Sequence, residues 1–274
     1  MTSTIPTIGK KTLLPALNRA GREIYSFREI CKLAGIAGNY AHNVVSLLEK
    51  EARLVRLERG TYLYVPEGFE GNWAGNTYLI ASHLVQPYAI SYWSALNHWH
   101  FTEQIPSTVF IQTTVRKFYS ERVILGVKYK LVTLGKNKFY GLATVWDKSH
   151  KIQMTGKEKT IVDCLDHPEY CGGIIEVVKG LHSGFVSGAD KLDMNKVINY
   201  ALKIDNKTVV KRLGYLFEVL NISVPEKKLF KMKAAIGKGY SLLDTTLPDT
   251  GKLNSHWRLK ENLPKDSLTE WRKH

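Results

Sequence analysis

The sequence predicts an α+β fold in two domains. Helical and β-rich patterns mix within the first 66 residues, and a segment rich in Gly and Asn at residues 67–76 then interrupts them. A longer series of β-rich runs, followed by helical periodicity, occupies residues 77–274. The chain has 274 residues, of which 44% are hydrophobic and 11% aromatic, so it is long enough to fill two cores. We expect an amino-terminal domain at 1–66, a linker at 67–76 and a larger mixed α/β domain at 77–274.

Two helices and a tight turn are predicted before residue 39. An apolar stripe predicts a helix from Thr12 to Ala20 that ends at Gly21. Ser26 and Glu29 have the spacing of a capping box, in which each side chain accepts the backbone N–H of the other residue, so a second helix begins there. Residues 35–38, Gly-Ile-Ala-Gly, end that helix, because glycine adopts positive φ without a Cβ clash.

A third helix is predicted from Asn39 to Lys50. Its apolar positions recur at helical spacing and should face the core; they are Ala41, Val44, Leu47 and Leu48. The outer face should then carry polar side chains with almost no charge, namely Asn39, Tyr40, His42, Asn43 and Ser46. Such a face suits contact with the edges of DNA bases, because Asn pairs bidentately with adenine.

Two β-rich runs, at 54–57 and 61–65, are joined through Arg59 and Gly60 and predict a hairpin. Three helices followed by a hairpin is the order of a winged helix-turn-helix, in which the third helix enters the major groove and the wing grips the backbone. The predicted DNA-contacting residues are Lys10, Lys11, Arg22, Arg28, Asn39, Tyr40, His42, Asn43, Ser46 and Arg59. A winged helix that docks a protein instead stays an alternative.

The net charge of +14 and the pI near 9.5 indicate an anionic partner. The densest basic block, from Arg116 to Lys159, lies outside the winged helix, so we expect a second basic surface. Its residues are Arg116, Lys117, Arg122, Lys128, Lys130, Lys136 and Lys138. The alternative is that these side chains are scattered over solvated strand edges, where they oppose aggregation.

The second domain should combine a mostly antiparallel sheet with helices. Helices are predicted at 78–85, 91–97, 172–181, 194–202, 207–220 and 225–236, and strands at 108–113, 127–134, 141–146 and 152–154. A capping-box spacing at Thr155 to Glu158 predicts one more helix, which runs to Leu165. The charged tail from Asn262 should be loose.

Candidates for chemistry are few. An aromatic block from Tyr88 to Phe101 reads as core, with stacking on a base or ligand as the alternative. His98 and His100 would share one face of a strand but have no third ligand, so we expect no metal and no cofactor. Asp163 and Asp166, one turn apart, are the only pair we would test for catalysis, and we expect none.

The cysteine pattern and the hydropathy of the chain bear on where it resides. Cys31 is predicted to be core, and Cys164 and Cys171 are predicted to be buried thiols, as in a reducing compartment. The sequence shows no long apolar run and no signal peptide, so we expect a cytoplasmic protein without a membrane partner.

Three stretches in this order resemble the AbiEi family, the antitoxins of type IV toxin–antitoxin modules that act in abortive infection, a phage defence. They are the end of the winged-helix pattern at 59–62, the run from Pro87 to Leu96, and the run from Lys159 to Gly173, and the segment at 251–259 is similar to the family's closing part. The resemblance implies a transcriptional repressor whose winged helix binds inverted repeats in operator DNA of its own operon. It also implies that the carboxy-terminal domain neutralises a nucleotidyltransferase-like toxin, functionally or by direct contact.

Two other classes of function stay open. A ligand-responsive winged-helix regulator would use the aromatic block as a small-molecule pocket. An enzyme acting on phosphate-bearing substrates would need Asp163 and Asp166 in a convergent set of carboxylates.

Overall fold

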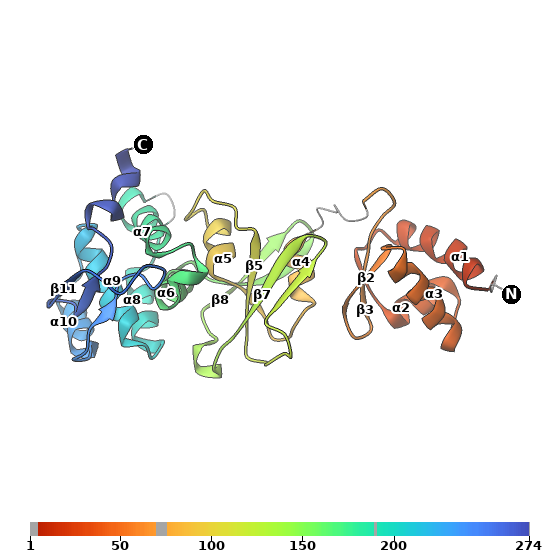
Figure 1. Ribbon diagram of the computed structural model, residues 1–274, viewed down its shortest axis with the longest axis horizontal. Coiled ribbons are helices and arrows are strands. Elements are labelled where there is room, and N and C mark those ends of the chain that lie inside the picture. Colours follow the sequence, from red (N-terminus) through yellow and green to blue (C-terminus); the bar gives the residue numbers. More distant parts are fainter. Residues whose placement is uncertain (1–4, 70–75, 189–190, 274) are drawn as a thin grey trace.

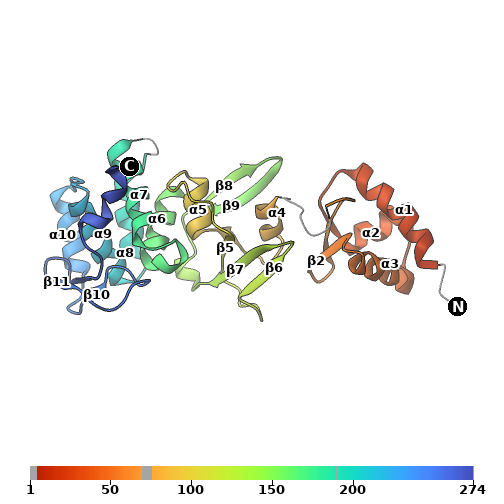
Figure 2. The ribbon, with the colours of Figure 1, turned by 45° about the horizontal axis from the view of Figure 1, so that its top comes forward.

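The computed structural model describes residues 5–69, 76–188 and 191–273 and shows an elongated α+β protein (Figure 1). An amino-terminal unit (residues 5–69) lies at one end, a six-stranded central sheet in the middle, and a group of helices at the other end (Figures 1 and 2). In the described part of the chain, no helix has both the length and the apolar character needed to cross a membrane. The proposed linker falls largely on residues 70–75, which lie outside the described residues.

The amino-terminal unit has its three helices and hairpin in the predicted order, with one further strand, β1, that the sequence did not predict. It comprises α1 (Ile5–Ala20), β1 (Ile24–Ser26), α2 (Phe27–Ala34), α3 (Gly38–Lys50), β2 (Leu54–Glu58) and β3 (Thr61–Tyr64). The strands form an antiparallel sheet in the order β1-β3-β2, with β2 at one edge. Its core consists of buried side chains from every element, among them Leu17, Tyr25, Ile30, Val44 and Leu48.

Local signals set the boundaries of α2 as predicted. The Ser26 hydroxyl accepts the Glu29 N–H at 3.2 Å, and the Glu29 carboxylate accepts the Ser26 N–H at 2.8 Å, so both halves of the capping box form. Gly35 ends the helix in the left-handed region with φ 65°.

Two predictions about the amino-terminal unit are wrong. The first helix begins at Ile5 rather than Thr12, and Pro6 is compatible with this start, since a helix needs no backbone N–H in its first turn. On α3, Ala41, Val44 and Leu48 are buried as predicted, but Val45 takes the place of Leu47, which is only half-buried.

The central sheet is mixed: three of its five strand pairings are antiparallel, where a mostly antiparallel sheet was expected, and two are parallel. Its strand order is β6-β7-β5-β4-β9-β8. The strands are β4 (Ala89–Ile90), β5 (Thr108–Thr113), β6 (Glu121–Ile124), β7 (Val127–Thr133), β8 (Leu142–Asp147) and β9 (His150–Thr155). The outer pairs β6–β7 and β8–β9 and the inner pair β4–β5 are antiparallel, whereas β5–β7 and β4–β9 are parallel. The short strand β4 therefore joins the two halves of the sheet.

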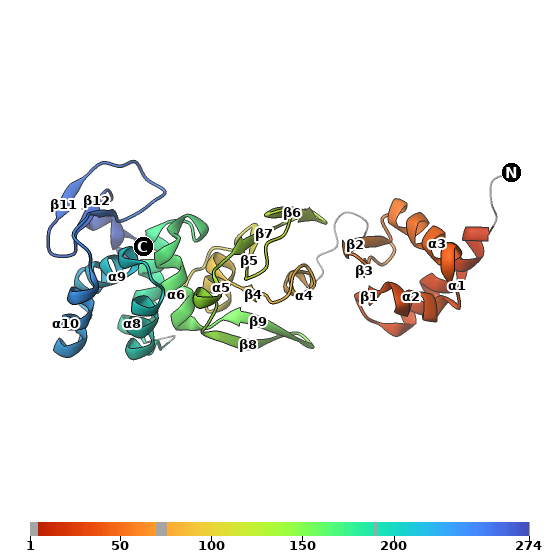
Figure 3. The same cartoon turned by 90° about the horizontal axis from the view of Figure 1, so that it is seen from below.

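The helices flank the sheet at both ends. Helix α4 (Thr77–Ser82) lies between the β6–β7 and β8–β9 hairpins, on the side of the amino-terminal unit (Figures 2 and 3). The other helices are α5 (Tyr92–His98), α6 (Lys157–Asp166), α7 (Ile174–His182), α8 (Met194–Lys203), α9 (Lys207–Val219) and α10 (Glu226–Ala235). A small sheet of β10 (Ser241–Leu242), β12 (Leu259–Glu261) and β11 (Lys252–Asn254) completes the far end.

Three further expectations for the larger domain are wrong. Thr155 does not cap α6, because it ends β9 and its hydroxyl bonds that of Thr160 at 2.7 Å, which leaves Gly156 as the N-cap. His98 ends a helix and His100 sits in a turn, so they do not share a strand face. The tail beyond residue 262 is not loose, since Leu268 is fully buried.

Apolar packing crosses the expected domain boundary. Leu57 and Leu63 of the amino-terminal hairpin are fully buried, and they pack in one cluster with Ile80, Val109 and Ile111 of α4 and the central sheet. The amino-terminal unit therefore shares apolar surface with the rest of the chain.

Candidate nucleic-acid interface

The outer face of α3 is polar and open, as predicted. Asn39, His42, Asn43 and Ser46 are all exposed, while the opposite face is buried. Tyr40 differs from these four, because it is half-buried and its hydroxyl accepts the Gly9 N–H at 2.8 Å. Tyr40 thus fastens α1 to α3.

A chain of contacts connects this face to the tip of the β2–β3 hairpin. The His42 ring stacks on Phe27 with centroids 4.4 Å apart and an angle of 17° between the planes. The Phe27 N–H in turn donates to the Gly60 carbonyl at 2.8 Å. Arg59, next to Gly60, is exposed. The helix face and the hairpin tip are therefore held as one surface.

The predicted phosphate-contacting cations fall into two groups. Lys10 pairs with Glu51 at 2.7 Å, and Arg22 pairs with Glu29 at 2.8 Å, so these two are already engaged. Hydrogen bonds from Ser26 and Arg22 lower the pKa of Glu29 to about 2, so its carboxylate stays charged. Exposed side chains that take part in no such pair in the described structure are those of Lys11, Arg28 and Arg59.

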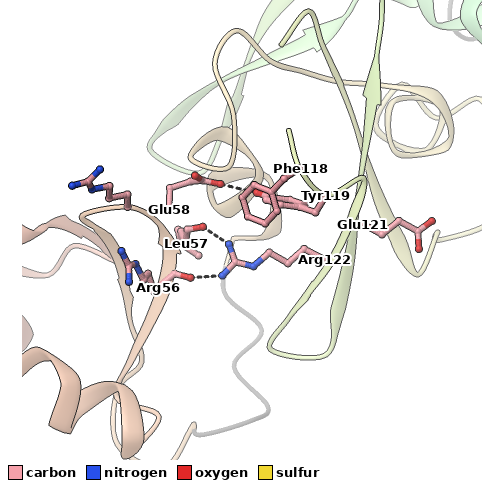
Figure 4. A pocket seen from close by; sticks show the side chains of 8 residues that line it. Arg56, Leu57, Glu58, Phe118, Tyr119, Glu121 and Arg122 are labelled. Carbon is pink, nitrogen blue, oxygen red and sulfur yellow. Dashed lines mark hydrogen bonds between the residues drawn. The ribbon is translucent and has the colours of Figure 1, made fainter. Parts of the chain in front are cut away.

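The hairpin is clamped to the central sheet along its outer edge. The Arg122 guanidinium of β6 donates to the backbone carbonyls of Arg56 and Leu57 on β2 (Figure 4). Glu58 accepts hydrogen bonds from the Tyr119 hydroxyl at 2.6 Å and from Lys117 Nζ at 3.0 Å. Burial and the neighbouring Glu58 carboxylate raise the pKa of Tyr119 to about 12, so the hydroxyl remains the donor. The Arg122 contacts supply hydrogen-bond donors to backbone carbonyls of β2, which is the edge strand of its sheet.

The residues of the predicted second basic surface do not form one free face. Lys117 and Arg122 belong to the clamp, Lys128 and Lys130 pair with Glu121 at 3.2 Å each, and Lys138 pairs with Asp166 at 3.2 Å. Exposed members without such a pair in the described part of the chain are Arg116 and Lys136.

The two aspartates considered for catalysis are buried in ionic contacts. Asp163 is 2% exposed and bonds Lys159, which is fully buried on the same helix, and burial raises the pKa of Asp163. Asp166 accepts hydrogen bonds from Lys138 and from Asn206, the latter at 2.5 Å. Among the described residues, no group of three His, Cys, Asp or Glu side chains is placed to hold a metal ion. Asp163 therefore pairs within α6, whereas Asp166 connects α6 to the segments that carry Lys138 and Asn206.

The aromatic block is mainly packing. Tyr92 and Phe101 are buried in the helical core, against which Trp93 and Trp99 pack, and Tyr88 is buried in the cluster that includes the central sheet. The three cysteines carry free thiols, as predicted. Cys164 and Cys171 are buried, whereas Cys31 is half-buried rather than core.

Comparison with known proteins bears on the fold alone. No family model and no curated protein matches this chain. Among solved structures, the chain is similar to the RV2827C protein from Mycobacterium tuberculosis, with a TM-score of 0.68 at 15% identity. The alignment covers 97% of this chain and 95% of that chain, so the whole α+β architecture is shared.

Proposed function

We propose that this protein is a DNA-binding antitoxin and an autoregulatory transcriptional repressor of the cytoplasm. The amino-terminal unit is a winged helix-turn-helix, with α3 as its recognition helix and the β2–β3 hairpin as its wing. It binds operator DNA that carries inverted repeats. The carboxy-terminal domain neutralises a nucleotidyltransferase-like toxin, and the protein itself catalyses no reaction.

The observation that carries the DNA-binding part is the surface that α3 and the hairpin tip form together. Its centre offers amide, imidazole and hydroxyl groups at Asn39, His42, Asn43 and Ser46, and its rim offers the Arg59 guanidinium. A helix fits the major groove, where such groups discriminate base edges, while guanidinium groups contact phosphate or the adjacent minor groove. The stack of His42 on Phe27 orients the imidazole before DNA arrives.

The residues of this surface have different roles. Asn43 and Asn39 read bases, His42 and Ser46 hydrogen-bond base edges or the backbone, and Arg59 contributes charge. Lys11 and Arg28, both exposed, add phosphate contacts at the margin. Tyr40 acts indirectly by positioning α3.

A salt-titrated binding assay tests these roles with the full-length chain. The probes are a duplex from the region upstream of its own reading frame and a scrambled duplex of equal length. Arg59→Ala should weaken binding to both duplexes and lower the steepness of log K against log salt by about 1, because one phosphate contact is lost. Asn43→Ala should keep the slope and reduce the preference for the upstream duplex by about 1–3 kcal/mol.

The outcome that contradicts the DNA-binding proposal is simple. If the full-length protein binds neither duplex at low salt, or if both variants change affinity and slope alike, the surface does not have the proposed roles. Lys227→Ala, an exposed lysine on α10 at the far end, is the control, and we expect its slope to equal that of the parent.

The antitoxin part rests on the resemblance to the AbiEi family. Co-expression with the product of the neighbouring gene tests it. If that gene encodes a nucleotidyltransferase-like toxin, the parent chain and Arg59→Ala should both restore growth, because neutralisation does not use the wing. Failure of the parent chain to restore growth would contradict this part alone.

A further inference from the structure

The connection between β5 and β6, residues 114–120, presents an aromatic ring directly beside the hairpin tip. Phe118 is 97% exposed, the highest exposure among the large hydrophobic side chains of the described residues. Its neighbours on both sides are fixed, because Lys117 and Tyr119 each bond Glu58 next to Arg59. The Phe118 ring also meets the Tyr119 ring edge-on, with centroids 5.0 Å apart. The exposed ring is thus held by an anchored segment.

An open groove of about 480 Å³ separates this ring from the hairpin. Figure 4 shows Phe118 and Tyr119 on one side of the groove and Arg56, Leu57 and Glu58 on the other. Arg59 lines it as well, so the residue proposed as the wing's phosphate contact and the exposed ring face the same space.

The charge of the groove favours an anion. Its two carboxylates are already paired, Glu58 with Lys117 and Glu121 with Lys128 and Lys130. The lysine hydrogen bonds hold the pKa of Glu121 below its usual value. Arg56 and Arg59, which line the groove, are exposed, and so is Arg116, two residues before Phe118 in the chain. A polyanion with apolar surface between its charges would complement this arrangement.

We propose that residues 114–120 form a second DNA-contacting element beside the wing, in which Arg116 contacts phosphate and Phe118 contacts the sugars and base edges of the minor groove. This inference rests on the proposed function, because it places the duplex on the α3 and hairpin surface. A duplex has the required chemistry, since its minor groove is lined by apolar sugar atoms between two rows of phosphates, and apolar side chains are used there by other DNA-binding proteins. The DNA-binding surface therefore extends beyond the amino-terminal unit onto the central sheet.

Hydroxyl-radical footprinting and affinity measurements on the full-length chain test this element. The upstream duplex serves as the probe. The parent chain should protect sugars in the major-groove site of α3 and in a flanking minor-groove stretch next to the wing. Phe118→Ala should abolish the flanking protection only, and weaken binding about tenfold at unchanged salt slope, because it removes burial of one aromatic ring. Arg116→Ala should lower the steepness of the salt dependence by about 1.

Phe230→Ala supplies the matched control. Phe230 on α10 is also exposed, at 75%, but lies at the opposite end of the molecule, and its variant should keep the parent footprint and affinity. If the parent chain binds and Arg59→Ala weakens binding, but Phe118→Ala keeps affinity and flanking protection, the inference is overturned while the proposed function stands. If Phe118→Ala instead loses only toxin neutralisation, the ring belongs to a protein interface and the inference is also overturned. If the parent chain does not bind DNA, the proposed DNA-binding function is overturned, and this inference is overturned with it.

Discussion

Replacement of Lys159 by Met should destabilise the protein far more than the loss of any exposed ion pair. Lys159 is fully buried and its ammonium bonds Asp163, which is 2% exposed. Methionine keeps most of the apolar stem but removes the charge, so the Asp163 carboxylate must remain charged without a partner or take up a proton. Removing one member of a buried pair costs about 3–5 kcal/mol. By contrast, Lys10→Met breaks a pair whose side chains are 32% and 35% exposed, worth about 0–1 kcal/mol.

The double variant Lys159→Met/Asp163→Leu separates burial of charge from general damage to α6. It removes both charges, so neither is left buried alone, and its stability should return to within about 1–2 kcal/mol of the parent. Urea denaturation followed by tryptophan fluorescence measures each free energy of unfolding. A cost of less than about 1 kcal/mol for Lys159→Met, or a double variant as unstable as the single one, would contradict this prediction. Either result would mean that an unpaired buried charge is not the cause of the lost stability.

Two further predictions concern single positions. The pKa of Glu29 is lowered to about 2 from its ordinary 4.5, so the stability that its charge contributes is present above pH 4.5 and is lost as pH falls toward 2. The Glu29→Gln variant keeps the cap but has no charge to lose. Between pH 4.5 and 2, the thermal melting temperature of this variant should therefore fall less than that of the parent. Equal acid sensitivity of the two proteins would contradict this. A Cβ at Gly214 would lie 2.1 Å from the Trp257 ring, so Gly214→Ala should cost about 1–3 kcal/mol despite the better helix propensity of alanine. Gly239→Ala, where a Cβ meets nothing within 4 Å, is the control in the same melting experiment, and equal melting temperatures would argue against the overlap.

The parts of the fold that sequence alone could predict are those set by neighbouring residues. The capping box at Ser26 and Glu29, the glycine at position 35 and the run of β-branched and aromatic residues in β5 act within a few residues, and each element forms where its pattern predicts. The predicted start of α6 at Thr155 is wrong, because Thr155 pairs with Leu142 of β8 as the last residue of β9, and Gly156 becomes the N-cap.

Features that depend on distant contacts could not be predicted. The strand β4 has two residues, too few for any periodicity, and exists because β5 and β9 bond it on both sides. Lys159 and Asp163 have the spacing of a solvated helix pair, and only the packing of α5, α7, α8 and α9 around α6 buries them. The sequence around Phe118 shows only a basic run, because the groove that this ring lines forms only when the hairpin lies opposite it.

The fastening of β2 by Arg122 and the shared packing of Leu57 and Leu63 have a geometric consequence. In a protein that reads a duplex with its first three helices, the bulk of the chain cannot swing freely about a tether. Each bound copy would instead project its far end at a fixed azimuth around the helical axis of the DNA. Two copies on neighbouring repeats would then approach or avoid each other according to the number of base pairs between those repeats.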